Sequence, residues 1–396
     1  MREITTTCSS ARRHLAACGG ALALTLAFGT PAGADIANIV IFGDSLSDTG
    51  NILNRTRALG GIEDRPEAPF YSNGRWTNGS DNTGIPDPND PTRRIPNPAL
   101  NLSRVSSAMG VWHERLATRL TVPAATDSLG GGRNYAYGGA VTRQNQFTDF
   151  GPTQQIGSQV RNLYRPQRLA DTERTLFVMW GGGNDIRDAA IANGATRESV
   201  LAAADTAVAN MEANIRFLKE MIHPNQSVFV LWPNLPPLGT IPDAQRLPAA
   251  IRTAMTDASA RFTTLQATAV MNLRNAFPRG SGGLDLAVLD IERLFGDLVA
   301  GNLDFRPTNT TQPIIEALDS DGGSNFSGLT FRPRPNPAHM APVDPDAFVF
   351  WDQVHPTARV HQSIGDAALR VVPAPGAASV LVMGLLAMRR RRLSAA

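Results

Sequence analysis

Short apolar runs rich in β-branched residues alternate along the chain with longer segments of helical periodicity. In 200–222 and 247–269, apolar residues recur every three or four positions, which is typical of helices. This alternation predicts an α/β fold in which a mainly parallel sheet carries helices on both faces. A site is expected in the loops at the carboxyl ends of the strands. The expected strands, each followed closely by Gly, Asn or Asp, are 38–42, 175–180, 227–232 and 284–289.

A serine stands directly after the first expected strand, in the string IVIFGDSLSDTGN. Ser45 would be presented there at the sheet edge; the alternative is that Asp44 and Ser45 cap the next helix. The string GGRNYAYGGA, residues 131–140, either brings backbone N–H groups of paired glycines close to a ligand or forms an ordinary tight turn. Together the two segments can supply a nucleophile and donors for developing negative charge.

Two later motifs carry further polar side chains. In WGGGNDI, residues 180–186, the amide of Asn184 can donate to developing negative charge, unless the Asn-Asp pair only caps a helix. In FWDQVHPT, residues 350–357, Asp352 stands three residues before His355. That spacing lets the carboxylate accept from one imidazole nitrogen while the other nitrogen faces a nucleophile. The alternative is a solvent-exposed histidine before a proline.

In this order and spacing, the four motifs resemble those of the GDSL, or SGNH, hydrolase family. NLPPLGTIP, residues 234–242, and FWDQVHPT resemble the plant-lipase-like branch of that family. The resemblance implies a three-layer α/β/α sandwich, flavodoxin-like, with a mainly parallel sheet of about five strands. The chain contains no G-x-S-x-G motif, which counts against an ordinary α/β-hydrolase.

The resemblance also implies roles for particular residues. Ser45 would be the nucleophile, His355 the base, and Asp352 the carboxylate that orients the histidine. Gly139 and Asn184 would join the backbone N–H of Ser45 in an oxyanion hole, with the preceding glycine as the alternative to Gly139. No metal and no cofactor is implied.

One stretch departs from the family pattern. Relatives usually continue from a GRFSNG-like string into a tryptophan-containing helix, whereas here about thirty residues separate GRWTNG, residues 74–79, from VWHERLA, residues 111–117. We interpret residues 80–110 as a Pro-rich loop inserted into a single hydrolase domain, residues 35–372. A loop of this length is expected to flank the site or to contact another surface.

Both ends of the chain resemble sorting signals. Residues 1–34 combine basic residues, an apolar stretch and a final Ala-Gly-Ala, which is typical of a signal peptide cleaved by signal peptidase. Residues 373–396 resemble a PEP-CTERM sorting and anchor segment processed by exosortase, with Pro-Ala-Pro in place of the usual Pro-Glu-Pro. The alternative is a simple tail anchor with a basic flank. We therefore expect an exported bacterial protein, secreted or held at the cell envelope, with transient membrane association through this segment.

The charge of the expected mature domain differs from that of the whole chain. The formal net charge is +2, of which residues 1–34 contribute a net +2 and residues 373–396 contribute +4, so the domain between them carries −4. It has no cationic excess for binding nucleic acid. Both cysteines, Cys8 and Cys18, lie in the leader, which excludes cysteine catalysis and thiolate metal sites from the mature chain.

These observations predict an exported serine ester hydrolase, an esterase or lipase that forms an acyl-enzyme on Ser45. The expected substrate is a small-molecule, lipid or acetylated-glycan ester. A polysaccharide deacetylase and an acyltransferase are alternatives that use the same triad. A non-catalytic binding protein at the cell surface is the alternative without catalysis.

Overall fold

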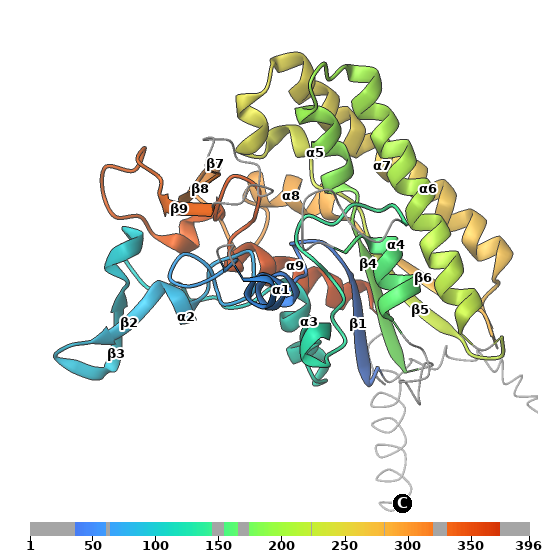
Figure 1. Ribbon diagram of the computed structural model, residues 1–396, viewed down its shortest axis with the longest axis horizontal. Coiled ribbons are helices and arrows are strands. Elements are labelled where there is room, and N and C mark those ends of the chain that lie inside the picture. Colours follow the sequence, from blue (N-terminus) through green and yellow to red (C-terminus); the bar gives the residue numbers. More distant parts are fainter. Residues whose placement is uncertain are drawn as a thin grey trace, which may run out of the picture. The chain divides into compact units, whose positions relative to one another are not determined.

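The computed structural model describes most of the chain (Figure 1). The expected signal peptide, residues 1–34, and the expected sorting segment, residues 373–396, lie outside the described residues. Within the described ranges, no helix combines the length and apolar character needed to cross a membrane. These ranges are 36–60, 64–144, 154–164, 174–222, 224–280, 282–319 and 331–372.

A four-stranded parallel sheet forms the centre of the fold. The strand order is β1-β4-β5-β6, and parallel pairing places Ile41 opposite Val178. Nearly every residue of β1, β4 and β5 is buried, because both faces are covered; this explains why their sequences are continuous apolar runs. The strands expected from the sequence are confirmed. Their bounds are β1 Asn38–Gly43, β4 Thr175–Trp180, β5 Val228–Pro233 and β6 Leu284–Leu289.

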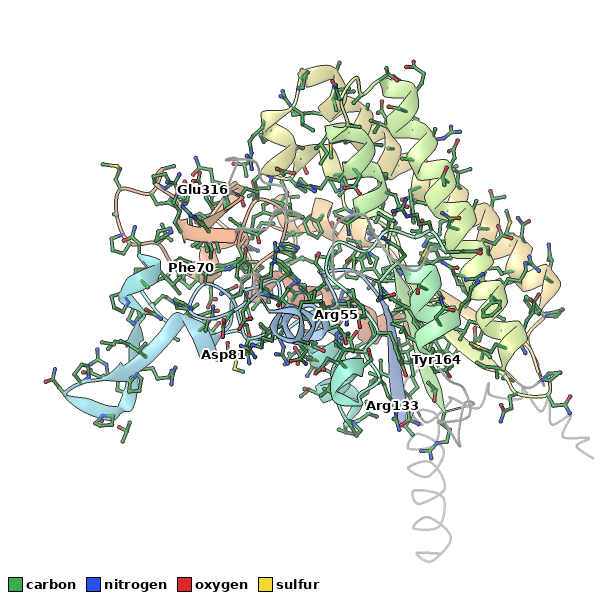
Figure 2. All side chains as sticks on the ribbon, in the orientation of Figure 1. Arg55, Phe70, Asp81, Arg133, Tyr164 and Glu316 are labelled. Atoms are coloured by element: carbon green, nitrogen blue, oxygen red, sulfur yellow. The ribbon has the colours of Figure 1, made fainter. Side chains whose placement is uncertain are left out.

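The segment 133–137 lies along the other edge of β1 and takes the place of a fifth strand. Ile41 donates its N–H to the carbonyl of Arg133 (3.0 Å), which Figure 2 labels, and accepts from the N–H of Tyr135 (2.8 Å). Only one isolated parallel bridge results, between Ile41 and Asn134. The chain thus passes from β1 to one neighbour and later returns as β4 on the opposite side. The carboxyl end of β1 is therefore the topological switch point, where α/β folds bind ligands.

Helices cover both faces of this sheet and complete a three-layer α/β/α arrangement (Figure 1). On one side α5 (Gly183–Ile191), α6 (Arg197–Met221) and α7 (Ala249–Ala276) pack together. On the other side α3 (Trp112–Leu120) packs on α9 (Ala358–Val371). The other α-helices are α1 Asn51–Leu59, α2 Ser80–Thr83, α4 Ile156–Ser158 and α8 Ile291–Val299. Shorter turns are the π-helix Gln159–Leu163 and the 3₁₀-helices Pro98–Leu100, Ser128–Gly130, Leu238–Thr240, Asp243–Arg246 and Pro345–Ala347.

A glycine sets the spacing between α3 and α9. A Cβ atom at Gly365 would lie 2.5 Å from the carbonyl oxygen of Trp112, so only glycine allows this close approach. The Trp112 ring is fully buried and meets Trp180 of β4 edge to face, with 5.5 Å between ring centroids. The pair of rings thereby joins this helix layer to the sheet.

The inserted segment 80–110 is folded and is not an irregular loop. Helix α2 leads into an antiparallel hairpin formed by β2 (Gly84–Asp87) and β3 (Asp90–Pro96). The prolines in these strands hide the β pattern from sequence analysis. Both strands of a two-stranded ribbon are edge strands, where proline is tolerated.

The base of the insertion belongs to a second hydrophobic cluster. Leu100 and Leu102 pack there with Tyr71 and Trp351, and a backbone bridge joins Leu102 to Val343. The insertion therefore supports the chain just before Asp352. The short strands around this cluster are β7 Asn309–Pro313, β8 Ile315–Asp319, β9 Phe331–Pro335 and β10 Phe348–Phe350.

A buried histidine, His361, lies in α9. Both of its ring nitrogens are inaccessible, and neither has a hydrogen-bond partner among the residues that the structure describes. Burial, together with the charges of His355 and His113, lowers the pKa of His361 to about 3, and Glu114 acts in the opposite direction. The imidazole is therefore neutral in the folded protein at all but strongly acidic pH.

This histidine predicts a specific loss of stability in acid. The folded-state pKa lies below the value of about 6.5 for an exposed histidine, so unfolding takes up a proton as the pH falls from 6.5 toward 3. Relative to wild type, His361→Leu should gain stability through that window, by up to about 1.4 kcal/mol per pH unit. Urea unfolding of both proteins at pH 7, 6 and 5 measures the difference. A difference that stays constant with pH would contradict the prediction.

Candidate active site

The turn after β1 holds Ser45 beyond the end of the strand. The carbonyl oxygen of Asp44 accepts the N–H groups of Ser47 (3.1 Å) and Asp48 (3.0 Å), which closes the turn. Ser45 is 7% exposed. Asp44 and Ser45 do not cap α1. Asp48 does, because its carboxylate accepts the first N–H groups of that helix.

The carboxylate of Asp48 is a buried anchor for two segments. It accepts the N–H groups of Gly50 (2.9 Å), Asn51 (2.8 Å) and Ile52 (3.2 Å) where α1 begins. Its fourth donor is the N–H of Gly138 (3.0 Å). Burial raises the pKa of Asp48 to about 6, and the four backbone donors limit the rise. The serine turn and the glycine loop are thus held by one side chain.

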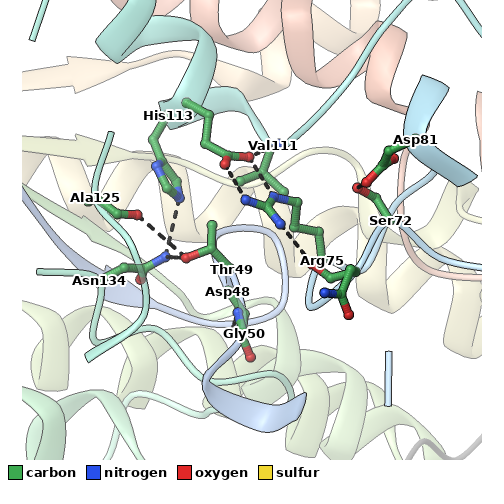
Figure 3. Close-up of polar contacts among 12 residues, drawn as sticks. Asp48, Thr49, Gly50, Ser72, Arg75, Asp81, Val111, His113, Ala125 and Asn134 are labelled. Carbon is green, nitrogen blue, oxygen red and sulfur yellow. Dashed lines mark hydrogen bonds and ion pairs between the residues drawn. The ribbon is translucent and has the colours of Figure 1, made fainter. Parts of the chain in front are cut away.

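Two asparagines join the same segments a second time. The side-chain amide of Asn51 donates to the carbonyls of Asn134 and Ala136, both at 2.8 Å. The amide of Asn134 donates to the carbonyl of Ser47 (2.6 Å) and to the hydroxyl of Thr49 (2.9 Å), as Figure 3 shows in part. The sequence analysis did not identify these anchors. The available signal was the presence of Asn51 in the serine motif and of Asn134 in the glycine motif.

An ion pair fixes the segment that follows α1. Arg75 donates to both carboxylate oxygens of Glu114, in α3, at 2.8 and 2.5 Å (Figure 3). Burial tends to raise the pKa of Glu114, but Arg75 outweighs it and holds this pKa below the ordinary value. Shortly before Arg75 in the chain, the hydroxyl of Ser72 donates to the carboxylate of Asp81 (2.9 Å). These bonds tie residues 72–81 to the helix layer and to the insertion.

Asp352, His355 and Ser45 form a continuous chain of hydrogen bonds. The Nδ1 atom of His355 lies 2.8 Å from Oδ2 and 3.0 Å from Oδ1 of Asp352, and its Nε2 atom lies 2.8 Å from the Ser45 hydroxyl. Asp352 is fully buried, and its Oδ1 also accepts the N–H groups of Val354 (2.8 Å) and His355 (2.7 Å). Burial raises the pKa of Asp352, but the charge and hydrogen bonds of His355 outweigh it, so this pKa is below the ordinary value. The histidine is 3% exposed, which rules out the solvent-exposed alternative.

Two aromatic residues complete the surroundings of this chain. The hydroxyl of Tyr71 donates to Oδ2 of Asp352 at 2.7 Å. The ring of Trp76 stacks on the His355 imidazole, with 5.3 Å between centroids and 28° between planes. Sequence analysis missed both residues. Their only signal was the position of Trp76 inside the string GRWTNG.

Asn184 and Asp185 lie in the first turn of α5. The N-cap position of α5 is Gly182, and Asn184 and Asp185 lie inside the helix. The pair therefore does not occupy the cap position. The amide of Asn184 donates to the carbonyl of Ala140 at 2.9 Å. The carboxylate of Asp185 accepts from the hydroxyl of Thr142 at 2.7 Å and from its N–H. Asp185 thus holds the far end of the loop whose near end is held by Asp48.

The two adjacent glycines of that loop differ in their surroundings. The N–H of Gly138 is engaged by Asp48, and a Cβ there would meet the Trp76 indole nitrogen at 2.6 Å. Gly139 is exposed and has a φ of 75°, a conformation that favours glycine. Of the two glycines, Gly138 is thus the one whose N–H is engaged by Asp48, while Gly139 lies exposed on the loop.

A mainly apolar cavity of about 60 Å³ lies beside Ser45 and Asn184. Gly139 and His355 are not among its lining residues. Burial raises the pKa of Asp44, on the cavity wall, to about 7. A positively charged side chain, Arg187, also lines the cavity. It donates to the carboxylate of Asp243 at 2.7 Å. Apolar lining residues include Leu46, Trp180, Leu235, Leu238, Ile241 and Phe295.

This arrangement suits nucleophilic chemistry. A serine hydroxyl becomes a nucleophile when a neighbouring imidazole takes its proton, and a carboxylate on the other ring nitrogen stabilises the imidazolium. Among the described residues, no group of three His, Cys, Asp or Glu side chains is placed to hold a metal ion.

Comparison with known proteins places the chain in a family. The sequence profile described as GDSL-like Lipase/Acylhydrolase matches residues 39–368. No curated protein matches the chain. Among solved structures, the chain is similar to the crystal structure of phospholipase A1 from Streptomyces albidoflavus NA297, at 14% identity and a TM-score of 0.35. That match covers 86% of this chain and 100% of the other. On the profile match over most of its length, the chain belongs to the GDSL-like lipase/acylhydrolase family.

Proposed function

We propose that this protein hydrolyses carboxylic esters through an acyl-enzyme on Ser45. The observation that carries the proposal is the hydrogen-bonded chain from the Ser45 hydroxyl through His355 to the buried carboxylate of Asp352. Its membership of the GDSL-like lipase/acylhydrolase family supports an ester as the substrate.

The proposed reaction has two halves. Ser45 Oγ attacks the ester carbonyl while its proton passes to Nε2 of His355, and Asp352 stabilises the resulting imidazolium. The tetrahedral intermediate collapses, the bond to the alcohol oxygen breaks, and the imidazolium returns the proton to that oxygen. Water then attacks the acyl-enzyme by the same route and releases the carboxylic acid, so that Ser45 is regenerated.

Three donors are proposed for the oxyanion. These are the backbone N–H groups of Ser45 and Gly139 and the side-chain amide of Asn184. An amide NH₂ carries two hydrogens, so Asn184 keeps one donor after its bond to Ala140. The buried carboxylate of Asp48 and the half-buried carboxylate of Asp185 hold the loop that carries Gly139, which supports a preorganised arrangement.

The apolar cavity is proposed to take the acyl chain. The leaving alcohol has to receive a proton from His355, which does not line the cavity, so the alcohol lies on the other side of Ser45. A mainly apolar cavity next to the nucleophile favours an acyl group longer than acetyl, because burial of each methylene contributes about 0.8 kcal/mol. An esterase or lipase is thus favoured over a deacetylase.

Export is proposed on the sequence alone. Residues 1–34 would be removed by signal peptidase, and residues 373–396 would be recognised by exosortase, which gives a secreted or envelope-associated enzyme.

Hydrolysis should depend on Ser45. In Ser45→Ala, kcat/KM for p-nitrophenyl butyrate should fall by about 10⁴-fold or more, because no other group replaces the nucleophile. Ser363→Ala is the matched control, since this partly buried hydroxyl of α9 contacts only the carbonyl of Arg359 among the bonds described. Purified wild-type, Ser45→Ala and Ser363→Ala proteins are compared with acetate, butyrate and palmitate esters. A kcat/KM in Ser45→Ala close to that of wild type would contradict the proposed function.

Narrowing the cavity should shorten the accepted acyl chain. Gly183 lines the cavity and has an ordinary backbone conformation; a Cβ there meets only Leu235, at 4.0 Å. Gly183→Val should leave kcat/KM for the acetate ester within about threefold and lower that for the hexanoate ester by about tenfold or more. The control is Gly296→Val, because a Cβ at Gly296 in α8 meets nothing and this residue does not line the cavity. Equal losses for both esters in Gly183→Val would remove the acyl-chain assignment.

A further inference from the structure

Tyr71 contacts the buried carboxylate that faces His355. We propose that Tyr71 is a positioning residue: its hydroxyl fixes the orientation of Asp352 and shares the negative charge that this carboxylate presents to His355. The inference rests on the proposed function of Ser45 and His355. It extends the chain of hydrogen bonds to a fourth side chain.

The geometry places the tyrosine hydroxyl on the oxygen that matters most for His355. Oδ2 of Asp352 lies closer to the imidazole than Oδ1 does, 2.8 against 3.0 Å, and Oδ2 is the atom that accepts from Tyr71 at 2.7 Å. Oδ1 is held by two backbone N–H groups. Without Tyr71, Oδ2 would keep only its contact with the imidazole, so the carboxylate could tilt about the better-held Oδ1 and weaken that contact.

Tyr71 is a permanent donor under ordinary conditions. The residue is fully buried, and burial together with the charge of Asp352 raises its pKa well above the ordinary value. The hydroxyl therefore keeps its proton throughout the pH range in which a histidine titrates. Because a donated hydrogen bond stabilises the anion, it also reduces the stabilisation that Asp352 gives to an imidazolium.

The segment that carries Tyr71 is fastened on both sides of His355. The carbonyl of Phe70 accepts from the indole of Trp351, next to Asp352, at 2.8 Å. Farther along, Thr77 donates to the carbonyl of Pro356, next to His355, at 2.8 Å. Between these points the Trp76 ring lies over the imidazole and meets the Tyr71 ring edge-on at 5.6 Å. Tyr71 is therefore held in place by its own segment, independently of its hydroxyl, and Tyr71→Phe should keep the packing.

The test uses a reaction that does not require a known substrate. A fluorophosphonate phosphonylates an activated serine: the Ser45 oxygen bonds to phosphorus, fluoride leaves, and the serine proton passes to His355. The rate constant for labelling Ser45 is measured between pH 5 and 9 on the full folded chain, with peptide mapping of the adduct. The other titratable groups that interact electrostatically with His355 are Asp44 and His361, and they are common to all variants.

Tyr71→Phe should slow labelling by about tenfold on the alkaline plateau, because the carboxylate no longer holds the imidazole in place. The acid limb of the profile should move to higher pH by about half a unit. Without the hydrogen bond from Tyr71, the Asp352 carboxylate stabilises the imidazolium more strongly. A purely structural tyrosine would lower Tm without moving this limb. A profile in Tyr71→Phe that matches wild type in both rate and limb therefore overturns the proposal.

Two further proteins keep the test decisive. If Tyr71→Phe does not fold, 3-fluorotyrosine at position 71 keeps the shape and donates more strongly. The acid limb should then move to lower pH, and an unmoved limb overturns the proposal.

Tyr164→Phe is the matched control, a buried tyrosine packed against Phe42 and Phe177. It should label like wild type. Failure of the proposed function is distinguishable, because wild-type Ser45 would then not be labelled at all.

Discussion

The fully buried carboxylate of Asp352 constrains the site more than any other group, because a buried charge is tolerated only when donors surround it. These donors come from distant parts of the chain: the Tyr71 hydroxyl, two backbone N–H groups at the start of the loop before α9, and the His355 imidazole. Satisfying one carboxylate thus brings together the segment after α1, the loop after β10 and, through His355, the serine turn after β1. The second hydrophobic cluster, with Trp351 and Tyr71, packs around the same point.

Two further carboxylates, the buried Asp48 and the half-buried Asp185, organise the glycine loop. Asp48 holds Gly138 and Asp185 holds Thr142, so both ends of the glycine loop are fixed by residues that lie shortly after the ends of strands β1 and β4 in the chain. Burial raises the pKa of each to about 6. The site therefore combines three features: the hydrogen-bonded chain from Asp352 through His355 to Ser45, the glycine loop held at both ends, and the apolar cavity. Ser45 and the residues that hold the glycine loop follow β1 and β4, neighbouring parallel strands at the switch point of the sheet, whereas Asp352 and His355 follow β10, outside this sheet.

The sequence predicted the parts of this arrangement that are local. The strands are continuous apolar runs, so periodicity indicated them, whereas the roles of Ser45, Asp352 and His355 were implied by the resemblance of their motifs to a known family. The bond between Tyr71 and Asp352 spans 281 residues, and no periodicity connects its partners. The hairpin of β2 and β3 was not predicted because its prolines interrupt the strand pattern, and only the finished structure shows that Leu100 and Leu102, which follow the hairpin, pack in one cluster with Trp351.

The central claim is that Ser45 carries a covalent acyl group, and trapping that group tests it most directly. A p-nitrophenyl N-butylcarbamate transfers a carbamoyl group that hydrolyses slowly from a serine, so the intermediate accumulates and survives digestion. Mass spectrometry of peptides should place the group on Ser45 in wild type and find none in Ser45→Ala. Release of p-nitrophenol by wild type with the group on another residue, or on none, would contradict the account.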